Sequence, residues 1–148
     1  MDQSDLEFDI PGDAKTYVDL DIHMSVLGKL VAQDGSALEK TDNTTLVNNL
    51  LHSLFSQCNV TLNAVSVSSS QDLYNYKSYL ETLLTYRHDA SQSHLTNAFW
   101  NPDEGDFIAQ NLPADTKNRG YQARWKLTYK NSEIEMHGRV SGGLFNVP

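Results

Sequence analysis

Three potential metal ligands occupy every second position near the N-terminus of this 148-residue chain: Asp19, Asp21 and His23. Alternate side chains of a β-strand point to the same face, so this spacing would align all three on one side of a strand. Carboxylate oxygens and imidazole nitrogens so placed could hold a cation. The alternative is an ordinary solvated face, which polar-out alternation predicts anyway. We favour the solvated face.

A second candidate is the adjacent pair His52 and Ser53, which could form a hydrolase triad with one of the many acids. The Gly-x-Ser-x-Gly elbow of such enzymes is absent, and a local turn or capping role is the better interpretation. Cys58 falls on the inward face of a predicted strand and is interpreted as a small core residue. His88 and His94 follow the end of a predicted helix, where a cation interacts favourably with the helix dipole; a ligand role is the less favoured interpretation.

The sequence contains no phosphate-binding loop, zinc-type cysteine pair or dinucleotide fingerprint. It also lacks the His-x-His pair of metalloenzymes on cupin-like barrels. An enzyme of that kind is therefore the least favoured of three hypotheses, after a structural protein and a carbohydrate-binding module. We therefore predict no catalytic residue, no metal or cofactor site, and a protein that is not an enzyme.

Aromatic and basic residues suggest binding roles instead. Trp100 and Trp125, with exposed tyrosines, could form a platform for sugar stacking, although aromatic residues near loops more often lie at a core edge or subunit interface. One basic segment stands out in the acidic chain: Lys117, Arg119, Arg124, Lys126 and Lys130. It is either an ordinary solvated segment or an electrostatic counterpart for an acidic face of a neighbouring copy.

The elements that would position these residues are mostly strands. Apolar and polar residues alternate over residues 6–10, 17–30, 58–67 and 133–140, which is typical of half-buried strands. The segment 17–30 exceeds the usual strand length, so we expect a bend or bulge in it, at Gly28. Asn63-Ala64 occupies the position of a two-residue hairpin turn, although alanine is unfavourable where φ is positive.

One clear helix is predicted over residues 73–86, where apolar residues recur at spacings of three and four: Tyr76, Tyr79, Leu80, Leu83 and Leu84. We expect this stripe to pack on the sheet. Residues 91–100 favour one or two further helical turns, and 101–120 a loop. Residues 120–129 fit either a short helix or a strand.

Together these patterns predict an all-β chain with one inserted helix: a single jelly roll, or Greek-key β-sandwich, over residues 1–148. A jelly roll has roughly eight strands, and only about five or six are evident here. Either further strands lie within residues 41–51 and 110–129, or the domain is incomplete at its C-terminus, as in a fragment or a short form.

Bulk composition excludes several classes of partner. The chain has 19 acidic and 11 basic residues and a formal net charge of -8, so it would repel nucleic acid and anionic membranes. No apolar run approaches the roughly 20 residues of a membrane-spanning helix, and no signal peptide is evident. The single cysteine excludes an internal disulfide framework.

An ordered series of blocks resembles a known family. The blocks are Leu6-Glu7-Phe8-Asp9-Ile10-Pro11-Gly12, Tyr17-Val18-Asp19-Leu20, residues 51–57, Val60-Thr61-Leu62-Asn63, residues 74–84, residues 92–100, and residues 133–145 with Met136-His137-Gly138-Arg139-Val140. In this order they resemble the penton, or minor capsid, protein of Maverick/Polinton-type elements and adintoviruses. The resemblance covers nearly the whole chain, as an N-terminal part or a short form of the family protein.

The resemblance implies a structural virion protein without catalytic activity. Its fold would be a single jelly roll that forms a homopentamer at the capsid vertices and contacts the double-jelly-roll major capsid protein. Its location would be the virion and, during assembly, the host nucleus or cytoplasm. The sequence departs from the family at Asn63-Ala64, where Asn-Gly is usual, in a divergent loop over 101–120, and in ending where family members continue. The alternative function is a carbohydrate-binding β-sandwich module.

Overall fold

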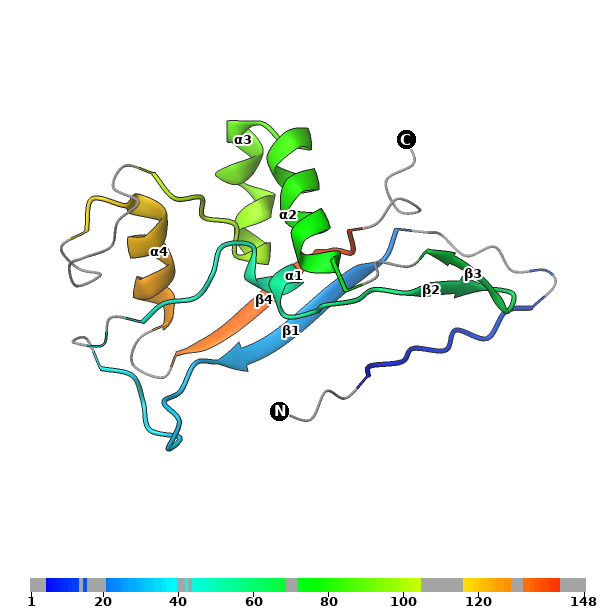
Figure 1. Cartoon of the computed structure of the whole chain (residues 1–148), viewed down its shortest axis with the longest axis horizontal. Helices are drawn as coiled ribbons and strands as arrows, with labels where there is room; N and C mark the ends of the chain where they lie inside the picture. Colours follow the sequence, from blue (N-terminus) through cyan, green and yellow to red (C-terminus); the bar gives the residue numbers. More distant parts are fainter. Residues whose placement is uncertain are drawn as a thin grey trace.

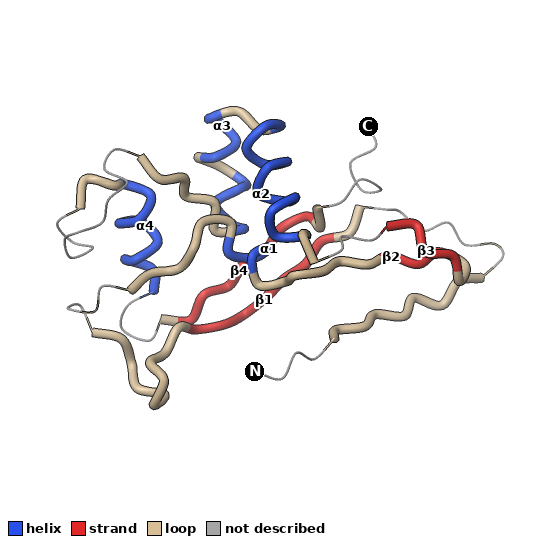
Figure 2. Tube along the Cα trace, viewed as in Figure 1, coloured by secondary structure: helices blue, strands red, loops and turns tan. Residues whose placement is uncertain are grey.

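The structure is a computed structural model that describes residues 5–13, 15, 21–39, 42, 44–68, 72–104, 116–128 and 132–141. Figures 1 and 2 show the elements in this order along the chain: β1 (His23–Lys29), α1 (Leu50–Ser53), β2 (Val60–Leu62), β3 (Val65–Ser68), α2 (Tyr74–Thr85), α3 (His88–Ser91), the 3-10 helix η1 (His94–Ala98), α4 (Arg119–Thr128) and β4 (Glu133–Arg139).

The centre of the molecule is a two-stranded antiparallel ribbon of β1 and β4. Its inward side chains pack on α1 and on the segment around η1, and the core comprises Leu50, Leu51, Ala98, Phe99, Ile134 and Met136. Met24, Val26 and Leu46 pack against this cluster. Figure 1 shows the helices α1, α2 and α3 gathered over one side of the ribbon. The alternation of inward and outward residues predicted for these two strands is confirmed.

The prediction of a bend or bulge at Gly28 is wrong. The register runs without a shift from His23 opposite Arg139 to Lys29 opposite Glu133. No atom lies within 4 Å of the position that a Cβ of Gly28 would take, so no crowding there forces the strand to bend. The described strand is seven residues long, a usual length, and residues 16–20 of the longer predicted segment lie outside the described residues.

The second sheet is the hairpin of β2 and β3, as the alternation predicts. Asn63 and Ala64 form its two-residue turn with φ values of 49° and 61°. Ala64 therefore adopts the left-handed conformation that was expected to be unfavourable, at a cost of about 1–2 kcal/mol. The register between the two strands shifts between Val60 and Thr61.

The expectation for residues 6–10 is wrong in the described chain. These residues belong to no strand, and Leu6, Phe8 and Ile10 are exposed rather than half-buried. Figure 1 shows them in an extended segment at the periphery of the molecule. The alternation is real, but a strand also needs a neighbouring strand to pair with, and none of the described strands is paired with this segment.

In the ambiguous segment 120–129, the described residues 120–128 are helical and belong to α4 (Arg119–Thr128). Its buried stripe consists of Gly120, Arg124, Trp125 and Thr128, which recur at helical spacing. The described residues are therefore mixed α/β, with two small antiparallel sheets, several helices and no closed barrel, rather than all-β with a single helix. The antiparallel strands and the helix inserted between them are confirmed. None of the helices in the described ranges has the length and apolar character needed to cross a membrane.

Candidate functional site

The outer face of α2 carries a row of exposed apolar side chains. Leu80 and Leu83 are about half exposed, at 53% and 52%, and Leu84 reaches 83%. Leu73, just before the helix, and Tyr76 are also exposed, at 56% and 66%. The prediction that this stripe packs on the sheet is therefore wrong, although the helix itself was predicted to within one residue at each end.

The inner face of α2 is instead polar. Its buried residues are Tyr74, Ser78 and Thr82, which follow one another at intervals of four. Asn49 Nδ2 donates a hydrogen bond of 2.8 Å to Ser78 Oγ, and both residues are fully buried. Thr82 Oγ1 donates to the backbone carbonyl of Ser78 at 2.8 Å. Because these buried groups are satisfied by hydrogen bonds, the polar stripe fixes which way α2 faces.

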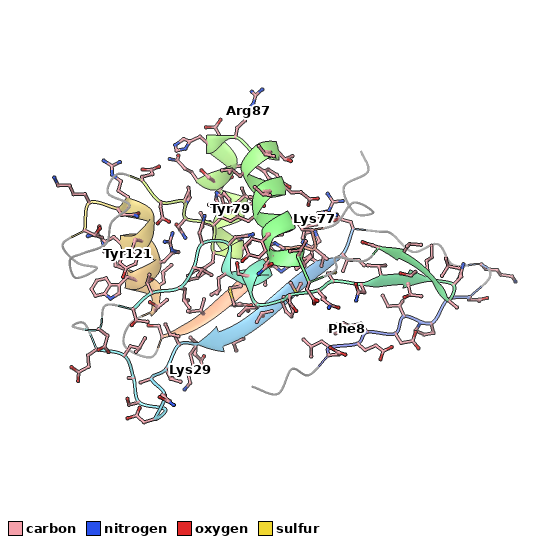
Figure 3. All side chains as sticks on the ribbon, in the orientation of Figure 1. Phe8, Lys29, Lys77, Tyr79, Arg87 and Tyr121 are labelled. Atoms are coloured by element: carbon pink, nitrogen blue, oxygen red, sulfur yellow. The ribbon has the colours of Figure 1, made fainter. Side chains whose placement is uncertain are left out.

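A shallow groove of about 440 Å³ runs along the exposed face, lined by Leu73, Tyr76, Lys77, Leu80, Glu81, Leu84 and Thr85. Lys77 and Glu81 form an ion pair of 3.9 Å along one side of it. Figure 3 shows Lys77 on the opposite side of α2 from Tyr79, whose ring lies 5.2 Å from that of Trp100. The groove is thus largely apolar and has one pair of opposite charges along its side.

His52 joins α1 to the first turn of α2. Tyr74 Oη and His52 Nδ1 share a hydrogen bond of 2.9 Å, and Tyr74 Oη accepts a second one of 3.3 Å from the backbone N–H of Ser141. Burial lowers the pKa of His52 from 6.5 to about 4 and raises the pKa of Tyr74. The imidazole is therefore neutral at neutral pH. Ser53 donates to the carbonyl of Asn49 at 2.9 Å, which is the local role predicted for it and involves no contact with a catalytic base.

The prediction that Trp100 and Trp125 could form a platform for sugar stacking is wrong. Trp100 and Trp125 are 4% and 3% exposed, so neither indole can offer its face to a sugar. Trp100 follows η1 and donates its backbone N–H to Leu95 O at 3.0 Å, whereas Trp125 lies on the inner side of α4. Both belong to the protein interior, in agreement with the core-edge alternative.

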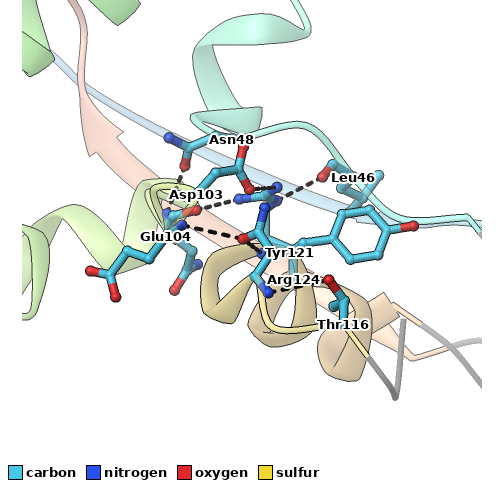
Figure 4. Close-up of polar contacts among 9 residues, drawn as sticks. Leu46, Asn48, Asp103, Glu104, Thr116, Tyr121 and Arg124 are labelled. Carbon is cyan, nitrogen blue, oxygen red and sulfur yellow. Dashed lines mark hydrogen bonds and ion pairs between the residues drawn. The ribbon is translucent and has the colours of Figure 1, made fainter. Parts of the chain in front are cut away.

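The residues of the basic segment differ in exposure to solvent. Arg124 is 3% exposed and binds within its own chain (Figure 4): its guanidinium donates to the carbonyl of Leu46 at 2.9 Å, to the carbonyl of Asn101, and to Asp103 Oδ1 at 2.7 Å. Lys117, Arg119 and Lys126 are exposed, and Lys130 lies outside the described residues. Only the exposed members of the segment could meet an acidic surface of another copy.

The outer side of the β1–β4 ribbon holds a chain of polar groups. Asp21 Oδ1 lies 3.4 Å from His23 Nε2 and accepts from Arg139 Nε at 2.8 Å. His23 Nδ1 lies 3.2 Å from His137 Nε2, and Ser25 Oγ lies 2.8 Å from His137 Nδ1. The outward face predicted for Asp21 and His23 is confirmed for His23 as part of β1; Asp19 lies outside the described residues.

Sequence reasoning missed His137 and Ser25 as members of this cluster. Alternation placed each of them on an outward face, but nothing in the sequence pairs β1 with β4. Cys58 is half-buried rather than fully internal, and burial raises the pKa of its thiol. His88 lies at the start of α3, and its Nε2 is 2.9 Å from Gln92 Nε2; His94 begins η1 and stacks edge-on against Tyr86.

Among the described residues, no three His, Cys, Asp or Glu side chains are grouped to hold a metal ion. The lining of the groove on α2 includes Lys77 and Thr85 but no histidine, cysteine or serine. Comparison with family models finds no match to the chain, and comparisons with curated proteins and with solved structures find no significant match.

Proposed function

We propose that the chain is a structural subunit that assembles with further copies of itself through the exposed face of α2, as a penton, or minor capsid, subunit at the vertices of an icosahedral capsid. The observation that carries this proposal is the orientation of α2, which buries Tyr74, Ser78 and Thr82 and leaves its leucines in solvent.

The exposed leucines carry an energetic argument. Burying a leucine side chain completely contributes about 1.5–3 kcal/mol, and the leucines of α2 retain from about half to four-fifths of their exposure. Contiguous apolar surfaces of this kind mark sites of protein interaction. Lys77 and Glu81 at the edge would supply the polar rim typical of an interface.

The choice of a capsid subunit rests on the ordered sequence blocks. Three of these blocks correspond to successive parts of the fold. The block 51–57 contains most of α1 and the turn after it, the block 60–63 contains β2, and the block 74–84 lies in α2. A jelly roll would need strands in addition to the four described here, and a homopentamer would bring a neighbour to the sheet edges that the described strands leave unpaired. The partners proposed are other copies of the chain and the double-jelly-roll major capsid protein.

The test is the mass of the purified chain by light scattering over a concentration series, alone and with the major capsid protein. We expect species larger than the 16.6 kDa monomer, with the pentamer as the defined end point. Replacing Leu80 and Leu84 by Glu should return the chain to a monomer, because two charges would then have to be buried in the interface.

Leu127→Glu is the matched control, because this leucine is 49% exposed but lies on α4. It should leave the mass unchanged. A wild-type chain that stays monomeric at all concentrations and does not bind the capsid protein would overturn the proposal. The carbohydrate-binding alternative loses its main support with the burial of both tryptophans, and a glycan array without hits would end it.

A further inference from the structure

Two imidazole rings face each other on the solvent side of the β1–β4 ribbon. His23 Nδ1 and His137 Nε2 are 3.2 Å apart, and the rings are nearly parallel, with 20° between their planes. The strand register puts His137 opposite Ser25 and His23 opposite Arg139, so the two histidines occupy diagonal positions of one antiparallel ladder. The backbone pairing that continues from this pair to Lys29 opposite Glu133, with the hydrogen bond from Val140 N–H to the carbonyl of Ile22 beyond it, holds this spacing.

The remaining nitrogen of each ring also has a polar neighbour. Asp21 Oδ1 lies 3.4 Å from His23 Nε2, and a carboxylate there favours a proton on Nε2 and leaves the lone pair on Nδ1. Ser25 Oγ lies 2.8 Å from His137 Nδ1. When this hydroxyl accepts the Nδ1–H, the lone pair of His137 is on Nε2, and both lone pairs then point at the space between the rings.

When Ser25 donates instead, the proton of His137 is on Nε2 and is donated to His23 Nδ1. The same positions of the heavy atoms therefore serve two states: two rings joined by a hydrogen bond, or two ring nitrogens available to one cation. Passing between them changes only the tautomer of His137 and the rotation of the Ser25 hydroxyl, with no change in the number of bound protons.

We propose that His23 and His137 form a binding site for a divalent transition-metal ion, with Zn²⁺ as its probe. Two imidazole nitrogens on one tetrahedral zinc ion lie about 3.3 Å apart, because each Zn–N bond is about 2.0–2.1 Å. The separation of 3.2 Å in this chain matches that value. Imidazole ligands select zinc, copper or nickel over calcium and magnesium. With two ligands from the chain, water occupies the other positions.

The surrounding charges are compatible with a cation. Among the described residues, Asp21 is the acid that contacts His23, and it balances the guanidinium of Arg139, whose Nε lies 2.8 Å from the carboxylate. Further along the same face, Glu135 lies opposite Leu27, and Lys29 lies opposite Glu133. The apolar face of α2 takes no part, because α2 contacts α1 and the histidines lie on the outward side of the ribbon.

The test is calorimetric titration of the chain with Zn²⁺ at neutral pH, with the histidine ring ¹⁵N resonances recorded in parallel. We expect one ion per chain and shifts of the His23 and His137 resonances. His23→Ala and His137→Ala should each weaken binding at least tenfold. Ser25→Ala keeps both ligands but removes the hydroxyl that accepts the proton of His137, and loss of such a partner of a metal ligand lowers metal affinity about 10–100-fold.

His94→Ala is the matched control: it removes another exposed histidine and should leave zinc affinity unchanged. The variants at positions 23, 25, 94 and 137 should unfold like the wild type without zinc, because these four side chains are exposed. Wild-type binding no tighter than that of His137→Ala would overturn the site, as would ring shifts confined to other histidines. Loss of zinc binding in Cys58→Ser would assign the ion to the thiolate and also overturn it.

Discussion

His52 shows how one buried hydrogen bond decides the role of a residue. Its side chain is hydrogen-bonded to Tyr74 and is held between α1 and α2, so it positions a helix and offers no base to solvent. The sequence alone favoured a structural role over a hydrolase triad because no nucleophile elbow was present. It gave no sign of the partner, Tyr74, which is 22 residues away.

The buried imidazole predicts acid sensitivity. The folded pKa of about 4 lies below the ordinary value of 6.5, so the unfolded chain binds a proton that the folded chain does not as the pH falls between these values. Stability should therefore fall by about 3 kcal/mol from pH 7 to pH 4 on account of this residue. Urea unfolding at several pH values measures it. His52→Asn, whose amide can donate to or accept from Tyr74 Oη, should lose this part of the pH dependence. A variant as acid-sensitive as the wild type would contradict the assignment.

Arg124 is predicted to be structural. Its replacement by Ala leaves the partly buried carbonyls of Leu46 and Asn101 without this donor, at a cost of about 1–3 kcal/mol for each unsatisfied group. We expect a total loss of roughly 3 kcal/mol in denaturant unfolding, with Arg124→Lys recovering only part of it because a single ammonium cannot reach all three acceptors. Arg119→Ala, on the same helix but exposed, should change stability by no more than about 0.5 kcal/mol. Equal effects of the two alanine variants would contradict this role.

At the scale of elements, helix α2 has its expected bounds and an unexpected orientation. Hydrophobic periodicity located the stripe of leucines, and it was natural to direct that stripe at the core. The buried contacts that decide otherwise come from Asn49 and His52, whose approach depends on tertiary structure. Helix α4 could not be assigned from the sequence for a related reason. Its buried stripe contains Gly120 and Arg124, so hydrophobic residues mark little of the helical spacing of this stripe.

Glycine at position 120 has its own structural reason. A Cβ there would lie 2.1 Å from the carbonyl oxygen of Pro102, so α4 can approach this backbone only with glycine at its second position. No hydrophobic pattern encodes such a contact. It is apparent only once residues 101–102 and α4 are placed side by side.

The orientation of α2 makes a direct prediction about stability. Ser78→Ala should destabilise the monomer by about 1–3 kcal/mol, because buried Asn49 Nδ2 loses its acceptor. Leu84→Glu should change it by no more than about 0.5 kcal/mol, since the leucine is 83% exposed. Denaturant unfolding at concentrations low enough to keep the chain monomeric measures both. The reverse order of effects would mean that the leucines face the core.

At the scale of the whole molecule, the pairing of β1 with β4 was beyond sequence reasoning. His23 and His137 are separated by 114 positions, and strand alternation predicts faces but not partners. Each strand's outward residues were correctly anticipated, yet the cluster on the ribbon emerges only from the register. The same limit applies to residues 6–10, whose alternation is clear and whose pairing partner is not among the described strands.

We propose that copies of the chain meet at the exposed face of α2. Hydrogen–deuterium exchange, measured below and above the concentration at which larger species form, tests it most directly. The prediction is that peptides covering residues 73–85 gain protection on assembly, whereas those covering α4 do not, and that Leu80→Glu with Leu84→Glu abolishes the gain. Assembly that leaves the exchange of α2 unchanged and protects other elements would contradict the claim.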